Sequence, residues 1–272
     1  MERTLATYHL GHAPIELARL TLQAELLRPI TERLLRSAGL APGMRVLEIG
    51  CGAGDVSFLA ADLVGPQGRV VGIDRAPEAI QHATERARSG GLRNVTFYKG
   101  GPDIPLSGEE PFDFLIGRYV LVHQQDPVGF MRLATANLRP GGTLAFHEPD
   151  SSLIAPSRPP IPIYDAFNAQ YHSATQTALA GKEAAFRLAA IFADCGLVSS
   201  EGFCERLVGL ENSDLFFLWR ATSYLAFKSG LYPDQATSDA AQLAADLQTA
   251  VRTVHGQVFG PDQWCLWAKL PA

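Results

Sequence analysis

The 272-residue sequence lacks an excess of basic residues. It has 23 lysines and arginines against 28 aspartates and glutamates, a net charge of -5 at neutral pH. This balance gives no general attraction for phosphate backbones, so we do not expect a nucleic-acid partner. Cysteine is also scarce, and the four present include no CxxC pair. We therefore predict neither a disulfide framework nor a metal site.

Long hydrophobic runs are missing as well. The most hydrophobic stretch, residues 215–227, is interrupted by Arg220 and is shorter than the roughly 20 apolar residues of a membrane span. The first residues lack the charged start and apolar core of a secretory signal peptide. We expect a soluble, cytoplasmic protein with no membrane partner. A content of 47% hydrophobic and 19% charged residues predicts a folded chain with a large core.

Apolar runs alternate with helical patterns through the first half of the chain, which predicts an α/β fold with a parallel sheet. The runs are apolar without strict alternation, as in strands covered on both faces. The expected strands are 44–50, 69–74, 94–100, 112–117 and 142–149, and the expected helices lie near 55–64, 77–90 and 127–138.

The flanking segments have a different character. Residues 14–38 have helical spacing, and we expect Pro29 to divide them into two helices. The proline-rich residues 151–167 predict a loop. The remaining expected elements are helices near 182–194, 213–229 and 237–255 and strands near 198–209 and 263–270.

The strongest local motif is VLEIGCGAG, in which Gly50, Gly52 and Gly54 follow an apolar strand. Glycines here permit a tight turn and the close approach of a ligand to the backbone. Asp74 ends the next strand, twenty residues beyond Gly54. Its carboxylate can accept hydrogen bonds from both hydroxyls of a ribose. Together these features predict a nucleoside-containing ligand, although a simple turn between strand and helix is the alternative for the glycines.

Two nucleoside cofactors, NAD and S-adenosylmethionine, fit that description. The spacing here is GxGxG rather than the GxGxxG of dinucleotide-binding proteins, and Asp55 stands where the last glycine would fall. A carboxylate there opposes a pyrophosphate, and Glu48 adds a second one. A ligand with an ammonium and a sulfonium group suits these charges better.

Four blocks resemble the class I S-adenosylmethionine-dependent methyltransferases, most closely the branch that methylates small molecules such as quinones and natural products. They are VLEIGCGAG, VVGIDRAPEAI, FDFLIGRYVLVHQQDP and LRPGGTLAFHEPD. The resemblance implies a Rossmann-like, seven-stranded, mostly parallel sheet between helices, with an antiparallel last strand and a helical cap. It also implies an N-terminal cap segment (1–39), an S-adenosylmethionine-binding core (40–150) and a part that completes the sheet and carries substrate-cap insertions (151–272).

By the same resemblance, the cofactor would contact residues at the ends of four strands. Gly50 and Gly52, with Glu48 nearby, would approach its amino-acid end; Asp74 would bind the ribose and Arg75 would lie along the adenine. Gly101 stands where the family usually has an acid that contacts adenine, and Pro102 and Asp103 follow it. We expect Asp103 to replace that acid. Arg118 and Tyr119 would close over the methionine part.

Candidates for catalysis follow from their places after the fourth and fifth strands. His123 or Glu148 would act as a general base where the acceptor loses a proton, and a structural hydrogen bond within the turn is the alternative for His123. The expected substrate-binding residues are Tyr8, His12, His147, Asp150, Tyr164, Tyr171 and His172. Packing in the core or in a surface helix is the alternative for the aromatic ones, and core packing is favoured for the aromatic residues between 216 and 227.

The function that these observations favour is in-line transfer of a methyl group from S-adenosylmethionine to a small, aromatic or apolar acceptor at oxygen, nitrogen or carbon. S-adenosylhomocysteine would be the product. Two other classes stay open: an NAD-linked oxidoreductase, and a cofactor-binding protein with a regulatory or non-methylating role. The apolar C-terminal half also leaves room for a homodimer interface.

Overall fold

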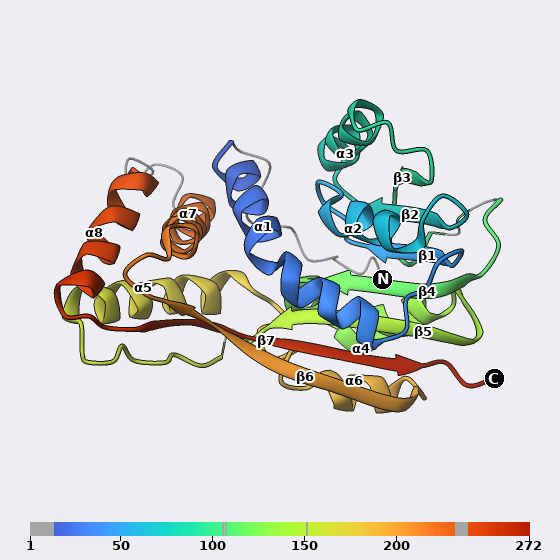
Figure 1. The fold of residues 1–272 in the computed structure, drawn as a ribbon. Helices are drawn as coiled ribbons and strands as arrows, with labels where there is room; N and C mark the ends of the chain where they lie inside the picture. Colours follow the sequence, from blue (N-terminus) through green and yellow to red (C-terminus); the bar gives the residue numbers. More distant parts are fainter. Residues whose placement is uncertain (1–13, 105, 107, 151, 232–238) are drawn as a thin grey trace.

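The computed structural model describes residues 14–104, 106, 108–150, 152–231 and 239–272. Strands and helices alternate through the first half of the chain, as the sequence predicts (Figure 1). The strands are β1 (Arg45–Ile49), β2 (Arg69–Asp74), β3 (Val95–Lys99), β4 (Phe112–Arg118), β5 (Leu138–Pro149), β6 (Val198–Gly209) and β7 (Val258–Lys269). The helices are α1 (Pro14–Ser37), α2 (Asp55–Val64), α3 (Pro77–Ser89), α4 (Pro127–Thr135), α5 (Pro162–Ala178), α6 (Leu188–Asp194), α7 (Asp214–Leu231) and α8 (Ala240–Thr253), with a short 3₁₀ turn at Leu121–His123.

The strands form one seven-stranded sheet in the order β3-β2-β1-β4-β5-β7-β6. Neighbouring strands from β3 to β5 are parallel, whereas β7 is antiparallel to both β5 and β6. This confirms the expected fold, including the antiparallel last strand. The strand order reverses between β1 and β4, and ligands of open α/β sheets bind at the carboxyl ends of strands at such a point.

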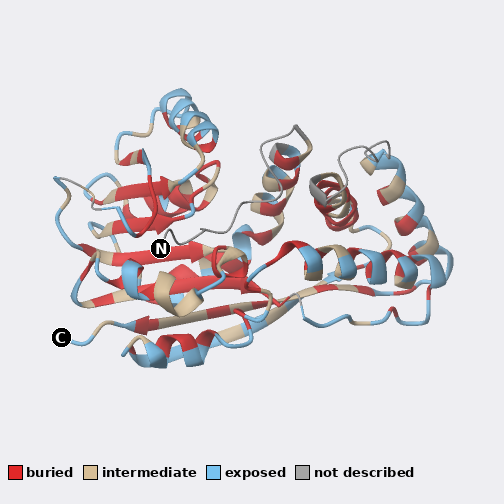
Figure 2. Ribbon diagram, turned by 180° about the vertical axis from the view of Figure 1, so that it is seen from behind, coloured by how far each residue is buried: buried red, intermediate tan, exposed pale blue. Residues whose placement is uncertain are grey.

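Three hydrophobic cores hold the molecule together. One packs α1, α2 and α3 against a face of the sheet, and the second packs α4 and α6 against the other face. The strands at the centre of the sheet are buried between these layers (Figure 2). The third core joins α5, α7 and α8. In Figures 1 and 2, α1 lies between α7 on one side and α2 and α3 on the other. The carboxyl ends of β1 and β4 therefore face helices, and we call α1, α5 and α7 the helical wall.

Several boundaries differ from the expectations. Pro29 does not divide the first helix: α1 is continuous over 24 residues, and packing against α2 and α7 compensates for the hydrogen bond that Pro29 removes. Part of the predicted loop 151–167 is helical, since α5 starts at Pro162, where a proline in the first turn loses no hydrogen bond. The helix expected from residue 182 starts only at Leu188, after a series of turns. The division of the chain at residues 39 and 150 stays a prediction.

No helix in the described part of the chain is both long enough and apolar enough to cross a membrane.

Candidate functional site

The glycine motif forms a loop with left-handed backbone at the end of β1. Gly50, Gly52 and Gly54 have φ angles of 70°, 50° and 87°. A Cβ atom at Gly50 would lie 2.8 Å from a methyl group of Val120, whereas one at Gly52 would meet nothing within 4 Å. The loop therefore needs glycine for its conformation, and at Gly52 its backbone is open to close approach.

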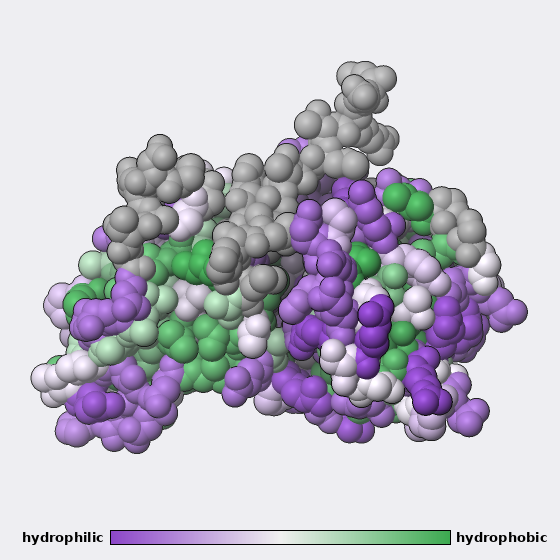
Figure 3. Space-filling model, turned by 90° about the horizontal axis from the view of Figure 1, so that it is seen from above, coloured by the Kyte–Doolittle hydropathy of each residue, from purple (hydrophilic) through white to green (hydrophobic). Residues whose placement is uncertain are grey.

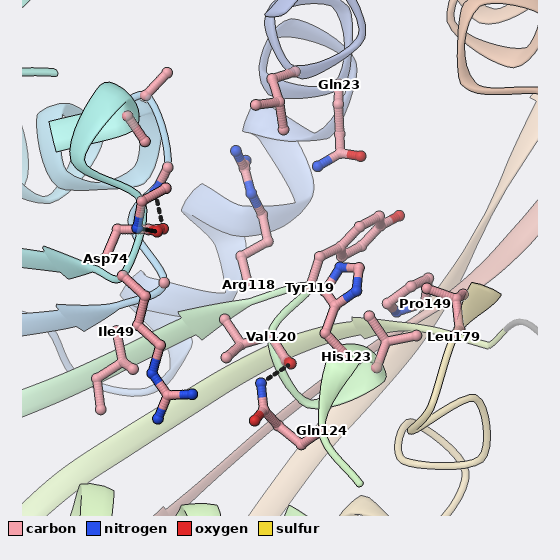
Figure 4. Close-up of a pocket in the computed structure, with 18 of the residues that line it drawn as sticks. Gln23, Ile49, Asp74, Arg118, Tyr119, Val120, His123, Gln124, Pro149 and Leu179 are labelled. Atoms are coloured by element: carbon pink, nitrogen blue, oxygen red, sulfur yellow. Dashed lines mark hydrogen bonds between the residues drawn. The ribbon is translucent and has the colours of Figure 1, made fainter. Parts of the chain in front are cut away.

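Asp74 faces this loop from the end of β2 (Figure 4). One carboxylate oxygen accepts a hydrogen bond from the Gly52 N–H at 2.9 Å, and the other accepts from the Ala76 N–H at 2.9 Å. A carboxylate has about four acceptor positions, so each oxygen can still accept another hydrogen bond. This geometry suits the binding of two neighbouring hydroxyl groups.

A cavity of about 320 Å³ extends from the glycine loop to the helical wall. This volume lies in the range of small-molecule sites. The end near the loop is lined by Gly50, Gly52, Ala53, Asp74, Arg75, Gly100, Gly101 and Pro102. The end near the helices is lined by Leu20, Gln23, Tyr119, Val122, His123, Pro149, Tyr171, Thr175, Leu179, Trp219, Phe227 and Pro261.

The end of β4 supplies the side chains between these two ends. In Figure 4, Arg118, Tyr119 and His123 rise into the space between Asp74 on one side and Leu179 on the other. Tyr119 has a φ angle of 58°, a strained conformation for a residue with a side chain. Burial lowers the pKa of the Arg118 guanidinium, and Thr31, at 3.5 Å, is its hydrogen-bond partner among the described residues.

A buried polar network supports Tyr119 from behind. Gln263 Nε2 donates to the carbonyl of Pro261, so its Oε1 accepts from the Tyr119 hydroxyl at 2.7 Å and from His147 Nε2 at 3.0 Å. This pattern assigns a ring proton of His147 to Nε2, and Nδ1 lies 3.0 Å from the Thr31 hydroxyl oxygen. Burial and, to a smaller extent, the nearby Arg118 cation together lower the pKa of His147 to about 3, against the opposing effect of its hydrogen bond to Gln263. His147 is therefore neutral.

His147 and Glu148 do not lie where the sequence analysis placed them. His147 is fully buried and does not line the cavity, so it acts through Gln263 rather than on a substrate. Glu148 is also fully buried, and its carboxylate accepts hydrogen bonds from the N–H groups of Val120, Leu121 and Val122 at 2.9, 2.9 and 3.2 Å. It fixes the turn that carries His123 and is not positioned as a general base.

The pKa of Glu148 reflects two opposing effects. Burial raises it and the three backbone hydrogen bonds lower it, and burial prevails, so that the pKa is about 7. Glu48 is similar, because burial raises its pKa to about 8 while a hydrogen bond from Ser57 lowers it. Glu48 lies behind the glycine loop and does not line the cavity. Asp55, which we expected to oppose a pyrophosphate, is paired with Arg86 at 2.7 Å.

The loop after β3 closes one side of the cavity. Gly101 and Pro102 line it, and Arg75 donates a hydrogen bond to Asp103 Oδ1 at 3.0 Å. A Cβ atom at Gly101 would lie 2.6 Å from that oxygen and 2.7 Å from Arg75 Nε. Asp103 does not itself line the cavity, so it reaches this site through Arg75.

The other expected substrate residues are divided between several places. Tyr171 lines the main cavity, whereas Tyr164 is fully buried in the third core, where its hydroxyl donates to the carbonyl of Phe259. Asp150 and His172 line a second, smaller cavity. Tyr8 and His12 lie outside the described residues.

Several residues of the site were missed or given another role by the sequence analysis. Trp219 and Phe227 were expected in the core. Both are buried, Phe227 within the third core, and both also form the cavity wall. Leu20 and Gln23 lie on α1, and Thr175 on α5, one turn beyond Tyr171. For Leu20, Gln23 and Thr175, the sequence offered no signal other than helical spacing. Among the described residues, no group of three histidine, cysteine, aspartate or glutamate side chains is arranged to hold a metal ion.

Comparison with known proteins agrees with this geometry. A family model described as a methyltransferase domain matches residues 40–188. The chain belongs to this methyltransferase family. Aklanonic acid methyltransferase DauC of Streptomyces sp. (strain C5) is 38% identical over 128 residues, which are 47% of this chain and 58% of that protein.

A second relative of this methyltransferase domain is the 2-phytyl-1,4-naphtoquinone methyltransferase of Synechococcus elongatus. It is 35% identical over 118 residues, 42% of this chain and 50% of that protein. The chain thus spans little more than half the length of these two relatives. Among solved structures, YcgJ from Bacillus subtilis has the same fold: the match has a TM-score of 0.57 at 19% identity and covers 89% of this chain and 98% of that one.

The family and the fold imply S-adenosylmethionine as the cofactor. The residues present fit this molecule. The open backbone at Gly52 permits close approach, the Asp74 oxygens can accept from two ribose hydroxyls, and the Arg118 cation lies beside the path toward the helical end.

Proposed function

We propose that the protein transfers the methyl group of S-adenosylmethionine to a small, apolar or aromatic acceptor. The observation that carries this proposal is the continuous cavity, which joins a polar glycine-loop end to a wall of Tyr171, Trp219 and Phe227. Relatives named for aklanonic acid and a phytyl naphthoquinone support an acceptor of this kind.

The glycine-loop end holds and orients the donor. Asp74 would accept hydrogen bonds from the ribose hydroxyls, Gly50 and Gly52 would let the amino-acid part approach the backbone, and Arg75 would hold the adenine. Arg118 would pair with the carboxylate of the methionine part. When bound, the cofactor supplies an electrophilic methyl group that is already activated by its sulfonium.

The helical end positions the acceptor and excludes water. Since the donor is already activated, alignment of the reacting atoms and removal of water account for most of the rate enhancement. His123 lines the cavity between its two ends and takes the proton of a hydroxyl or amine acceptor. Glu148 assists by holding the turn of His123 through Val120, Leu121 and Val122.

The experiment that tests this proposal is methyl transfer from isotopically labelled S-adenosylmethionine to a panel of phenols, hydroquinones and aromatic amines. Turnover of at least one acceptor supports it. Binding of the cofactor with no transfer to any of them favours the regulatory alternative.

The role of His123 has its own test. His123→Ala should lower kcat by roughly 100-fold or more without changing the affinity for S-adenosylhomocysteine. His255→Ala is the matched control, because His255 is exposed and remote from the cavity. Unchanged turnover across the pH range would remove His123 as the base and leave alignment alone.

Three further expectations belong to this proposal: a cytoplasmic location, no nucleic-acid partner and a homodimer. Exposed apolar side chains such as Leu153, Ile154 and Phe186 are compatible with an interface between two copies. Light scattering of the purified protein at several concentrations tests the dimer directly.

A further inference from the structure

A second cavity of about 50 Å³ lies beside the helical end of the main cavity. It is bounded by α5, α7, the chain that follows β5 and the first residues of β7. Tyr171, Thr175 and Pro261 line both cavities and so form the partition between them. One water needs about 10 to 15 Å³ of accessible cavity volume, so this space admits a small polar group.

An acidic side chain with an unsatisfied oxygen lines this second cavity. Asp150 is 2% exposed, and its Oδ1 accepts hydrogen bonds from the N–H and the hydroxyl of Ser152 at 2.8 and 2.6 Å. Its Oδ2 is buried and has no hydrogen-bond partner. A buried acceptor left in this state is costly, which indicates that a donor belongs beside it.

A basic side chain with an unsatisfied nitrogen lines the same cavity. Arg220 on α7 is 4% exposed, its Nη2 donates to the side chain of Asn168, and its guanidinium stacks 4.2 Å from the ring centre of Tyr171. Its Nε is buried without a hydrogen-bond partner, and Arg220 forms no ion pair with another described residue. A buried cation in this position requires an acceptor.

We infer that the second cavity is a subsite that receives a hydroxyl group of the acceptor, placed between Asp150 Oδ2 and Arg220 Nε. A hydroxyl donates one hydrogen bond and accepts others through a single oxygen, so it satisfies both groups in a space of this size. A carboxylate would be repelled by Asp150, and an apolar group would leave both atoms unsatisfied. This inference rests on the proposed function, because it assumes that the acceptor occupies the main cavity.

The inference defines the substrate class more closely. The acceptor places its reacting atom near His123 and carries a second hydroxyl that passes the partition of Tyr171, Thr175 and Pro261. A site built to bind a hydroxyl discriminates strongly against the analogue that lacks it, because its own buried polar groups are then left unpaired.

The test compares naphthols with dihydroxynaphthalenes as binding probes. Affinities of 1-naphthol, 2-naphthol and the 1,5-, 2,6- and 2,7-dihydroxynaphthalenes are measured by calorimetry on the full chain with S-adenosylhomocysteine present. At least one diol should bind about tenfold or more tightly than either naphthol, the scale of a hydrogen bond to a charged group. Asp150→Asn and Arg220→Met should each remove this advantage and leave naphthol binding unchanged.

Controls and opposite outcomes separate this inference from the proposed function. Asp246→Asn and Arg252→Met, which change exposed residues of α8, should keep the preference for the diol. Because the comparison of diol and naphthol is made first on the unaltered protein, it does not depend on how the variants fold. Equal affinity of diols and naphthols, no binding of any diol, or a preference that survives both substitutions would overturn the subsite. Failure of the protein to bind S-adenosylhomocysteine would instead overturn the proposed function.

Discussion

The two ends of the main cavity are formed by different kinds of chemical group. The glycine-loop end consists of backbone at Gly50 and Gly52 and of one carboxylate, Asp74, all within a short distance along two neighbouring strands. The helical end consists of side chains such as Tyr171, Trp219 and Phe227, which come from separate helices. In Figure 3, hydrophobic residues gather on the left half of the surface, which by comparison with Figure 1 carries α7 and α8.

The difference predicts that the two ends tolerate substitution to different extents. Backbone contacts at the glycine-loop end constrain the chain to glycine and a fixed turn, whereas side chains at the helical end can change without altering the sheet. We expect substitutions at the two ends to have separable effects, and the following predictions test that separation from the largest expected effect to the smallest.

The largest effect concerns the buried network that supports the boundary between the two ends. His147 has an ordinary pKa of 6.5 and a pKa of about 3 in the folded protein. Stability from the neutral ring is present above pH 6.5 and is lost as the pH falls toward 3. The difference of 3.5 pH units at about 1.36 kcal/mol each amounts to on the order of 5 kcal/mol.

This acid sensitivity is measured by urea unfolding between pH 3.5 and 8. His147→Gln should lose much less unfolding free energy than the unaltered protein as the pH falls, and exposed His255→Gln should follow the unaltered protein. Parallel curves for His147→Gln and the unaltered protein would contradict the buried neutral imidazole. Glu148 and Glu48 act in the opposite direction, since their raised pKa values cost stability as the pH rises from 4.5 toward 7 and 8.

Trp219→Ala tests the helical end alone. Trp219 is 2% exposed and its ring packs against that of Phe216, so its truncation should lower the unfolding free energy by about 3 to 5 kcal/mol. Affinity of the folded protein for S-adenosylhomocysteine should stay unchanged in calorimetry. Phe186→Ala is the control, because that ring is 68% exposed and its loss should cost about 0.5 kcal/mol or less. A large loss of cofactor affinity in Trp219→Ala would show that the two ends are not separable.

Asp74→Ala tests the glycine-loop end. Loss of charge-assisted hydrogen bonds to the ribose should weaken S-adenosylhomocysteine binding by about 1.5 to 3 kcal/mol, or roughly 10- to 150-fold. Affinity for 2-naphthol should not change. Asp246→Ala on the exposed face of α8 is the matched control. Cofactor affinity equal to that of the unaltered protein would refute the ribose assignment.

The smallest effect is expected at Gly101. In Gly101→Ala the new methyl group displaces the flexible ends of Arg75 and Asp103, which are exposed, so the cost should stay below about 1 kcal/mol in both stability and cofactor affinity. Calorimetry with S-adenosylhomocysteine measures it. A loss of tenfold or more would show that Arg75 and Asp103 cannot shift without losing their place beside the adenine.

The turn at the glycine-loop end could be predicted from the sequence because its determinants are local. Three glycines with positive φ and an aspartate at the next strand end leave a recognisable pattern within 25 residues. The residues after β5 were harder, since spacing placed His147 and Glu148 at the ligand edge but did not show that both point into the protein, toward Gln263 and the Val120–Val122 turn.

The helical end was predicted only in outline. The pattern of apolar residues indicated helices after residue 150. Trp219 and Phe227 were predicted to be core residues, because apolar side chains that line a cavity have the same helical spacing as those of a core. The expected division of α1 at Pro29 was wrong because packing against α2 and α7 outweighs the helix-breaking preference of proline. Which side chains meet across α1, α5 and α7 depends on contacts between distant segments.

The most direct test of the central claim is thermal unfolding of the full chain with S-adenosylhomocysteine, S-adenosylmethionine or NAD. A ligand at about 100 times its dissociation constant adds roughly 2.7 kcal/mol to the stability of the folded state, enough to raise the midpoint by several degrees. The account predicts this rise with both adenosyl compounds and none with NAD. A rise with NAD alone, or no rise with any of the three, would contradict it.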